Sequence, residues 1–106
     1  MEKEIKENEY ITRLKKAVVS YFKEDNVKII LFGSRARGQE YRSSDVDIGI
    51  IPFGDTEIEN VKITYLKEEI ENLNIPYKAE IVNFSEVSAD FKKEALKEVI
   101  IWKDWN

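Results

Sequence analysis

The sequence predicts one small α+β domain, residues 1–106, in which a mixed β-sheet is backed by helices on one face. Two observations predict this class. Three segments have apolar residues at helical spacing, and three short apolar runs rich in β-branched residues lie between or beside them. The expected order is helix, strand, short turn, strand, helix, strand, helix. A chain of 106 residues can bury a modest core, enough for a single domain.

The helices follow from the apolar periodicity and from capping signals. The predicted helices cover residues 4–23, 57–73 and 89–101. Thr56 followed by Glu59 resembles a capping box for the second helix. Ser85 or Ser88 can cap the third helix. The apolar positions expected to face inward on that helix are Phe91, Ala95 or Leu96, and Val99.

The strands are bounded by turn residues. The predicted strands cover residues 27–32, 45–51 and 77–84. Pro52 ends the second strand, which we expect to be flanked by the other two. Gly33 closes the first strand, and one helical turn is expected to begin at Ser34 and to end at Gly38.

Composition narrows the chemistry. The chain has no cysteine and no histidine, which excludes disulfides, thiolate metal sites and a histidine general base. A bound metal would need oxygen ligands, which favours Mg²⁺ or Mn²⁺.

Charge and hydropathy bear on partners and location. The net charge of −4 argues against extended binding to nucleic acid, which requires a basic surface. The N-terminal stretch "MEKEIKENEY" lacks the apolar core of a signal peptide. No apolar run approaches the roughly 20 residues that a membrane span needs. We therefore expect a cytoplasmic protein.

Two aspartates stand out in the predicted strand 45–51. Asp45 and Asp47 share one face because strand side chains alternate, and the apolar residues between and after them face the core. Two carboxylates this close repel each other, so the pattern favours a divalent cation between them. The alternative interpretation is an edge strand with a solvated acidic face.

The glycine turn upstream suggests a phosphate site. Gly33 allows close approach of a ligand to the backbone, and free N–H groups near Ser34 can bind an anion. Arg35 and Arg37 carry fixed charges that suit phosphate oxygens. The alternative is a solvated basic turn whose arginines pair with Glu24 or Glu40. Together the turn and the aspartates could hold the two ends of a triphosphate–Mg²⁺ complex.

The stretch "GSRARGQEYRSSDVDIGI" resembles the motif of polymerase-β-like nucleotidyltransferases, in which Gly-Ser and a short turn precede Asp-x-Asp. The "GSRARG" form and the short chain resemble the minimal nucleotidyltransferase (MNT) group, which pairs with helical HEPN proteins in toxin–antitoxin systems. The resemblance spans roughly 27–101. It implies the polymerase-β-like fold, Mg²⁺ or Mn²⁺ as cofactor, and ATP as nucleotide substrate. The nucleotide-binding residues that it implies are Gly33, Ser34, Arg35, Arg37 and Ser44.

The family also has a third carboxylate on a neighbouring strand, usually Asp. The matching stretch "AEIVNF" places Glu80 there, so the resemblance implies Asp45, Asp47 and Glu80 as catalytic and metal-binding residues. Glu is longer than Asp by one methylene, about 1.5 Å. The alternative for Glu80 is a solvent-facing residue that pairs with Lys78.

The resemblance implies transfer of a nucleoside monophosphate, AMP from ATP, to a hydroxyl acceptor. A tyrosine of a HEPN partner is the acceptor it favours, in a hetero-oligomer, and the chain would then act as an antitoxin. The alternative is a catalytically weak or inactive module that neutralises its partner by binding. A lone enzyme acting on a small molecule such as an aminoglycoside fits the short chain less well.

Two tryptophans lie near the C-terminus, in "VIIWKDWN". Trp102 and Trp105 are expected at or beyond the end of the last helix. They either fold back to complete the core or anchor a partner.

Overall fold

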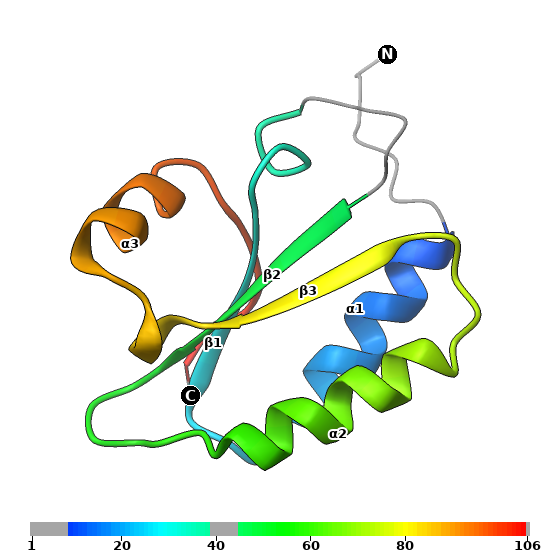
Figure 1. Cartoon of the computed structure of the whole chain (residues 1–106), viewed down its shortest axis with the longest axis horizontal. Helices are drawn as coiled ribbons and strands as arrows, with labels where there is room; N and C mark the ends of the chain where they lie inside the picture. Colours follow the sequence, from blue (N-terminus) through cyan, green and yellow to red (C-terminus); the bar gives the residue numbers. More distant parts are fainter. Residues whose placement is uncertain (1–8, 39–44, 106) are drawn as a thin grey trace.

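The computed structural model describes residues 9–38 and 45–105 (Figure 1). Its helices are α1 (Glu9–Tyr21), α2 (Asn60–Glu71) and α3 (Ala89–Ala95). Its strands are β1 (Val27–Phe32), β2 (Asp45–Pro52), β3 (Lys78–Asn83) and β4 (Ile100–Lys103), and a short 3-10 helix, η1, spans Phe84–Glu86. The predicted α+β class with a small mixed sheet is confirmed.

The strands form one sheet in the order β3-β2-β1-β4. β1 pairs antiparallel with β2 and β4, and β2 pairs parallel with β3, so the prediction that β2 lies between β1 and β3 is confirmed. Phe32 at the end of β1 is opposite Asp47, and Asp47 is opposite Glu80 of β3. The end of β1 and the beginnings of β2 and β3 therefore meet at one end of the sheet.

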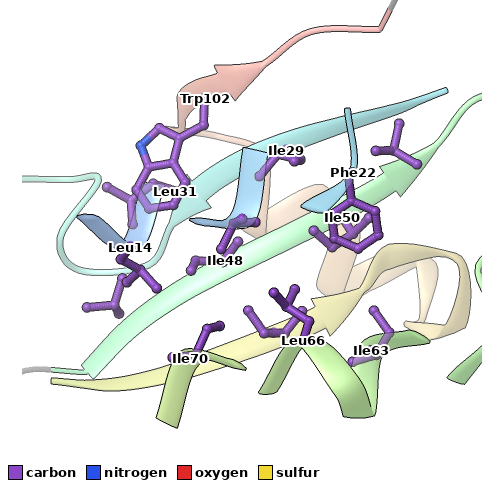
Figure 2. Packing of buried hydrophobic residues seen from close by; sticks show 14 of the residues in the cluster. Leu14, Phe22, Ile29, Leu31, Ile48, Ile50, Ile63, Leu66, Ile70 and Trp102 are labelled. Atoms are coloured by element: carbon purple, nitrogen blue, oxygen red, sulfur yellow. The ribbon is translucent and has the colours of Figure 1, made fainter. Parts of the chain in front are cut away.

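The main core lies between the sheet and the pair α1 and α2 (Figure 2). It is built from the alternating apolar positions of the strands and from one stripe of each helix. The fully buried members include Leu14, Val18, Phe22, Val27, Ile29, Val46, Ile48, Ile50 and Leu66. Burial of each such side chain stabilises the fold by about 1.5–3 kcal/mol. This layer therefore determines which residues of β2 face the helices and which face the other side of the sheet.

The opposite face of the sheet is covered along part of its length. Ile30, Phe32, Ile51 and Phe84 form a second buried cluster there. The ring of Phe91 on α3 meets Phe32 edge-on, with the ring centroids 6.0 Å apart. α3 therefore covers the face opposite α1 and α2 (Figure 1). The expectation that all helices back one face is wrong for α3, because β1 and β2 carry apolar side chains on both faces at this end.

The last predicted helix is too long. We expected residues 89–101, but α3 ends at Ala95 and residues Ile100–Lys103 form β4. The apolar residues at helical spacing continue past Ala95, although Val99, Ile100 and Ile101 belong to a run of β-branched residues that favours a strand. Pairing with the open edge of β1 decides the outcome, since Ile101 is opposite Ile30 and Ile100 is opposite Leu31.

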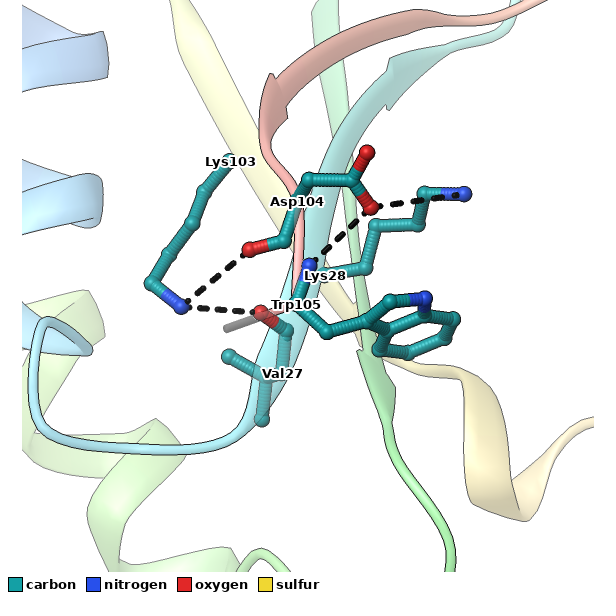
Figure 3. A network of polar contacts seen from close by, with 5 residues as sticks. All are labelled: Val27, Lys28, Lys103, Asp104 and Trp105. Atoms are coloured by element: carbon teal, nitrogen blue, oxygen red, sulfur yellow. Dashed lines mark hydrogen bonds and ion pairs between the residues drawn. The ribbon is translucent and has the colours of Figure 1, made fainter.

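Polar contacts fasten the end of β4 to the beginning of β1 (Figure 3). The Lys103 ammonium donates to the carbonyl oxygens of Asp25 and Val27 at 3.2 and 3.1 Å. The Asp104 carboxylate accepts from the Trp105 backbone N–H and lies 3.9 Å from the Lys28 ammonium. These contacts hold the C-terminal segment beside the first strand.

The two tryptophans have different surroundings. Trp102 is buried in the main core, with 7% of its surface exposed. Trp105 is half-buried, and its ring lies 5.2 Å from that of Phe53 and under the Lys28 ammonium. Trp102 thus completes the core, in keeping with the first of the two interpretations of this pair.

The helix ends agree with the sequence signals in part. Ser88 caps α3, and its hydroxyl accepts from the Phe91 N–H at 3.1 Å. α2 begins at Asn60 rather than 57, and its N-cap residue Glu59 makes no side-chain cap, so the predicted capping box is absent. The predicted start of the first helix, residues 4–8, lies outside the described residues. Across the part of the chain that is described, no helix has the length and apolar character needed to cross a membrane.

Candidate active site

The three predicted carboxylates lie on the same face of the sheet. In β2, Val46 and Ile48 are buried in the main core. Asp45 and Asp47 alternate with them along the strand and therefore point to the opposite face. Glu80 is the direct neighbour of Asp47 across the parallel β2–β3 pair and shares its face. Asp45 is exposed and Asp47 is partly buried. The fold therefore brings together residues separated by 33 positions or more in the sequence.

Asp47 has the most perturbed electrostatic environment of the three. Burial raises the pKa of its carboxyl group, and the negative charges of Asp45 and Glu80 raise this pKa further. The positive charge of Arg37 acts in the opposite direction. An ionised Asp47 is thus held at a free-energy cost, which a divalent cation would remove.

Gly33 approaches the Asp47 side chain more closely than any other residue type could. A Cβ atom on Gly33 would overlap Oδ2 of Asp47 and lie 3.2 Å from its Cγ. Gly33 also has φ +81°, a left-handed conformation that favours glycine. The glycine at the end of β1 therefore provides the space that the Asp47 carboxylate occupies.

The turn after Gly33 is one helical turn, as predicted. The Arg37 N–H donates to the carbonyl oxygens of Gly33 and Ser34, both at 3.2 Å, and the Gly38 N–H donates to Arg35. Gly38 ends the turn with φ +80°. Within the described residues, the N–H groups of Ser34, Arg35 and Ala36 donate to no other backbone group. They remain available at the beginning of the turn, where an anion is stabilised.

The two arginines of the turn have different positions. Arg37 is exposed, and its charge acts on Asp47. Arg35 is half-buried: its Nε donates to the backbone carbonyl of Asp45 at 3.3 Å, and its guanidinium lies 4.5 Å from the centre of the Tyr77 ring. Neither arginine forms an ion pair with Glu24. Glu40, the other predicted partner, lies outside the described residues.

Glu80 faces two environments. It is the register neighbour of Asp47, and its carboxylate lies 3.9 Å from the Lys78 ammonium, with 52% of the Glu80 side chain and 73% of the Lys78 side chain exposed. Among the described residues, no three acidic side chains converge closely enough to hold one metal ion. Glu80 thus shows both the position that the resemblance implies and the pairing that was the alternative.

The donor chemistry at this end of the sheet fits a hard divalent cation. Mg²⁺ is commonly held by one or two carboxylates together with phosphate oxygens of its substrate, rather than by a cage of protein ligands. Asp45 and Asp47 supply such a pair, next to the free N–H groups of the turn. Ser44, predicted as a nucleotide contact, lies outside the described residues.

Gly49 and Phe84 are parts of this face that we did not predict. Gly49 follows Asp47 by two positions and so points the same way, and the Phe84 ring fills the space where its side chain would be. A Cβ there would meet Cε1 of Phe84 at 2.5 Å. Phe84 therefore closes the acidic face on the side away from the turn. A glycine inside a strand often marks such a close approach, so the signal was present in the sequence.

A surface hollow borders the acidic face along the free edge of β3. Its volume is about 400 Å³, and α2, β3 and the segment between them surround it. The lining residues include Ile70 and Lys67 of α2, Tyr77, and Glu80. Glu80 thus lies between the acidic face and a space large enough for part of another molecule.

The model of the polymerase β nucleotidyltransferase family matches residues 15–105. The chain belongs to this family. The general activity of this family is nucleotidyl transfer.

Solved structures share the fold of this nucleotidyltransferase. A protein described as a minimal nucleotidyltransferase superposes with a TM-score of 0.67 at 24% identity, over 87% of this chain and 92% of the other. A chain of a toxin–antitoxin complex solved with AMP-PNP gives 0.66 at 16% identity, over 85% and 73%. A chain from the complex of a tri-AMPylated Shewanella oneidensis HEPN toxin with its MNT antitoxin gives 0.62 at 12% identity, over 88% and 71%. No match was found among curated proteins.

Proposed function

We propose that the protein is a Mg²⁺-dependent nucleotidyltransferase that transfers AMP from ATP to a hydroxyl group of a partner protein. One observation supports this most directly: the Asp47 carboxylate lies against Gly33, at the beginning of a turn with free N–H groups. A carboxylate pair and an anion site in contact suit the two ends of a metal–triphosphate complex.

Each group has a distinct role in this proposal. Asp45 and Asp47 hold the cation, and the N–H groups of the turn with Arg37 hold the β- and γ-phosphates. The cation, when bound, neutralises charge on the triphosphate and supports in-line displacement at the α-phosphorus. Glu80 would be available beside the two aspartates once it releases Lys78, and it would accept the proton of the acceptor hydroxyl. The bond from the acceptor oxygen to the α-phosphorus forms, the α–β bridging bond breaks, and pyrophosphate leaves.

The acceptor is proposed from the neighbouring structures. One of them is a HEPN toxin complex in which the toxin is AMPylated three times. We propose a tyrosine of a HEPN toxin as acceptor and an antitoxin role for this chain, in the cytoplasm. The hollow beside Glu80 offers space for the segment of the partner that carries the acceptor.

Transfer is tested with labelled nucleotide. The protein is incubated with Mg²⁺ and the product of the adjacent gene, in parallel with ATP labelled at the α- or the γ-phosphate. We expect label on the partner from the α-position and none from the γ-position. Asp45→Asn and Asp47→Asn should each abolish labelling, and Asp55→Asn in the exposed turn after β2 is the matched control. Label from the γ-position would indicate a kinase and contradict the proposal.

The contact between Glu80 and Lys78 favours a second candidate, a binding module without catalysis. In that case Glu80 remains paired with Lys78, and the chain neutralises its partner by covering it. The two candidates differ in whether neutralisation of the partner requires the two aspartates and label transfer. If Asp45→Asn with Asp47→Asn neutralises the partner as well as wild type does, and no label transfers, the binding module is correct.

A further inference from the structure

We propose that Arg35, oriented by Tyr77, is a positioning residue that holds Asp45 in place, and that it does not contact phosphate. This inference rests on the proposed metal site at Asp45 and Asp47. It assigns different tasks to two arginines that stand two positions apart in the same turn.

The first step is the backbone of Asp45. The pairing of β1 with β2 ends at Phe32 and Asp47, so Asp45 extends two residues beyond it. On the other side, Asp45 is opposite Lys78 at the beginning of β3. Among the described residues, strand pairing therefore holds β2 on only one side where it carries this carboxylate. Nε of Arg35, 3.3 Å from the Asp45 carbonyl oxygen, supplies a donor on the side that β1 leaves open.

The second step is the orientation of Arg35. Its guanidinium lies 4.5 Å from the centre of the Tyr77 ring, within the range of a cation–π contact. The Tyr77 ring in turn meets the Tyr10 ring at a centroid distance of 6.1 Å and an interplanar angle of 87°. Tyr10 belongs to α1, so the ring under Arg35 is supported by a helix. We call the contacts among Arg35, Tyr77 and Asp45 the arginine clamp.

The third step separates Arg35 from Arg37. Arg35 is half-buried, with Nε on a carbonyl oxygen and its plane on a ring, which fixes the guanidinium toward β2 and β3. Arg37 is exposed, and its charge reaches the Asp47 carboxylate. A planar cation that is already stacked and hydrogen-bonded serves geometry, whereas a free one can follow a phosphate.

The test uses Mn²⁺ alone, because the two roles predict opposite signs. If Arg35 acts only through its charge near a cation site, Arg35→Ala should leave Mn²⁺ affinity unchanged or raise it. If Arg35 positions Asp45, Arg35→Ala should weaken Mn²⁺ binding by about 10-fold, as is usual when a group supporting a metal ligand is lost. Calorimetric titration of the protein with Mn²⁺ measures this without nucleotide. Unchanged or tighter binding would overturn the proposal.

Tyr77 provides the matched variants. Tyr77→Leu removes the ring and should weaken Mn²⁺ binding about as much as Arg35→Ala does. The double variant should bind Mn²⁺ with about the affinity of the weaker-binding single variant. Tyr77→Phe keeps the ring and should lose clearly less Mn²⁺ affinity than Tyr77→Leu does. Additive losses would show that the two residues act separately, against the clamp. If Tyr77→Leu does not fold, the sign of the effect in Arg35→Ala and the behaviour of Tyr77→Phe still decide.

The failure of the clamp can be told from failure of the proposed function. If wild type binds Mn²⁺ and Arg35→Ala binds equally well, the clamp is wrong and the metal site stands. If wild type binds no Mn²⁺, either alone or with α,β-methylene ATP present, the metal site is wrong. Urea unfolding of wild type, Arg35→Ala, Tyr77→Leu and the double variant then tests the contact itself. Additive effects of the two substitutions on the free energy of unfolding would contradict the clamp as well.

Discussion

Gly33 and Asp47 are fitted to each other across the first two strands: the space that a side chain on Gly33 would need is occupied by the carboxylate of Asp47. Their backbones are held together by the antiparallel pairing that ends at Phe32 and Asp47. The turn that offers free N–H groups is thereby placed directly against the more buried of the two aspartates. This contact joins the proposed anion site to the proposed metal site.

Gly33→Ala should inactivate the protein and destabilise it more than Gly38→Ala does. The two glycines have nearly the same φ, +81° and +80°, so the conformational penalty of about 1 kcal/mol is shared. A Cβ at Gly38 meets nothing within 4 Å, whereas one at Gly33 overlaps the Asp47 carboxylate. Urea unfolding should give a difference of about 1–3 kcal/mol between the variants, the usual range for overpacking.

A second substitution checks the cause of that difference. Asp47→Ala removes the overlapping carboxylate, so Gly33→Ala should cost much less in an Asp47→Ala background than in wild type. Equal effects of Gly33→Ala and Gly38→Ala, or no relief from Asp47→Ala, would show that Gly33 and Asp47 are not in contact.

Gly49→Ala should destabilise the fold by about 1–3 kcal/mol without touching a charged group. The new methyl would lie 2.5 Å from Phe84 and 3.1 Å from the Ile30 side chain, so the ring must move. Gly54→Ala, in an open turn after β2, is the control for steric overlap: nothing lies within 4 Å of a Cβ there, so its cost comes only from its φ of +58°. Denaturant unfolding measures both, and Phe84→Leu should reduce the cost of Gly49→Ala. A cost that Phe84→Leu leaves unchanged would place the strain elsewhere.

Asp47→Asn should make the protein more stable at pH 7 while it removes activity. Because folding raises the pKa of Asp47, the folded state holds that proton more tightly than the unfolded state, and the stability contributed by this group falls as pH rises through the folded pKa. Asparagine does not ionise, so the Asp47→Asn variant does not lose this stability as the pH rises. The gain should disappear below the ordinary aspartate pKa, about 3.9.

Unfolding curves of wild type and Asp47→Asn at pH 7 and pH 3 test this dependence. An Asp47→Asn variant that is less stable than wild type at pH 7 would mean that the carboxylate has favourable partners that outweigh its burial.

Trp102→Ala should destabilise the protein by about 3–5 kcal/mol, whereas Trp105→Ala should cost clearly less. Trp102 is buried in the main core, and Trp105 rests on Phe53 at the surface. Thermal unfolding of the isolated protein measures both. Similar small losses for the two variants would place Trp102 outside the core and return it to the list of residues available to a partner.

Local pattern predicted most of the fold. Strands β1, β2 and β3 lie within one residue of the predicted ends, because their apolar runs stop at Gly33, Pro52 and Ser85 or begin after Pro76. β4 was missed because its formation depends on the open edge of β1, which the sequence of residues 100–103 does not reveal. The position of α3 on the second face also depends on contacts between distant residues, those of Phe91 with Phe32 and Phe84.

The site was predictable where residue spacing determines geometry. Alternation along β2 places Asp45 and Asp47 together, and the turn after Gly33 follows from its own residues. The environment of Arg35 was not predictable, since Tyr77 is 42 positions away in the sequence and reaches Arg35 only through the parallel pairing of β2 and β3. The pairing of Glu80 with Lys78 is consistent with the sequence, because residues two positions apart in a strand share a face.

Calorimetry with Mg²⁺ and α,β-methylene ATP, which resists cleavage at the α-phosphorus, tests the central claim most directly. We expect saturable binding at micromolar concentrations that requires Mg²⁺, is lost in Asp45→Asn and Asp47→Asn, and is retained in Asp55→Asn. Binding that is absent, or that is the same without Mg²⁺ and in both aspartate variants, would contradict a metal–triphosphate site at Gly33, Asp45 and Asp47.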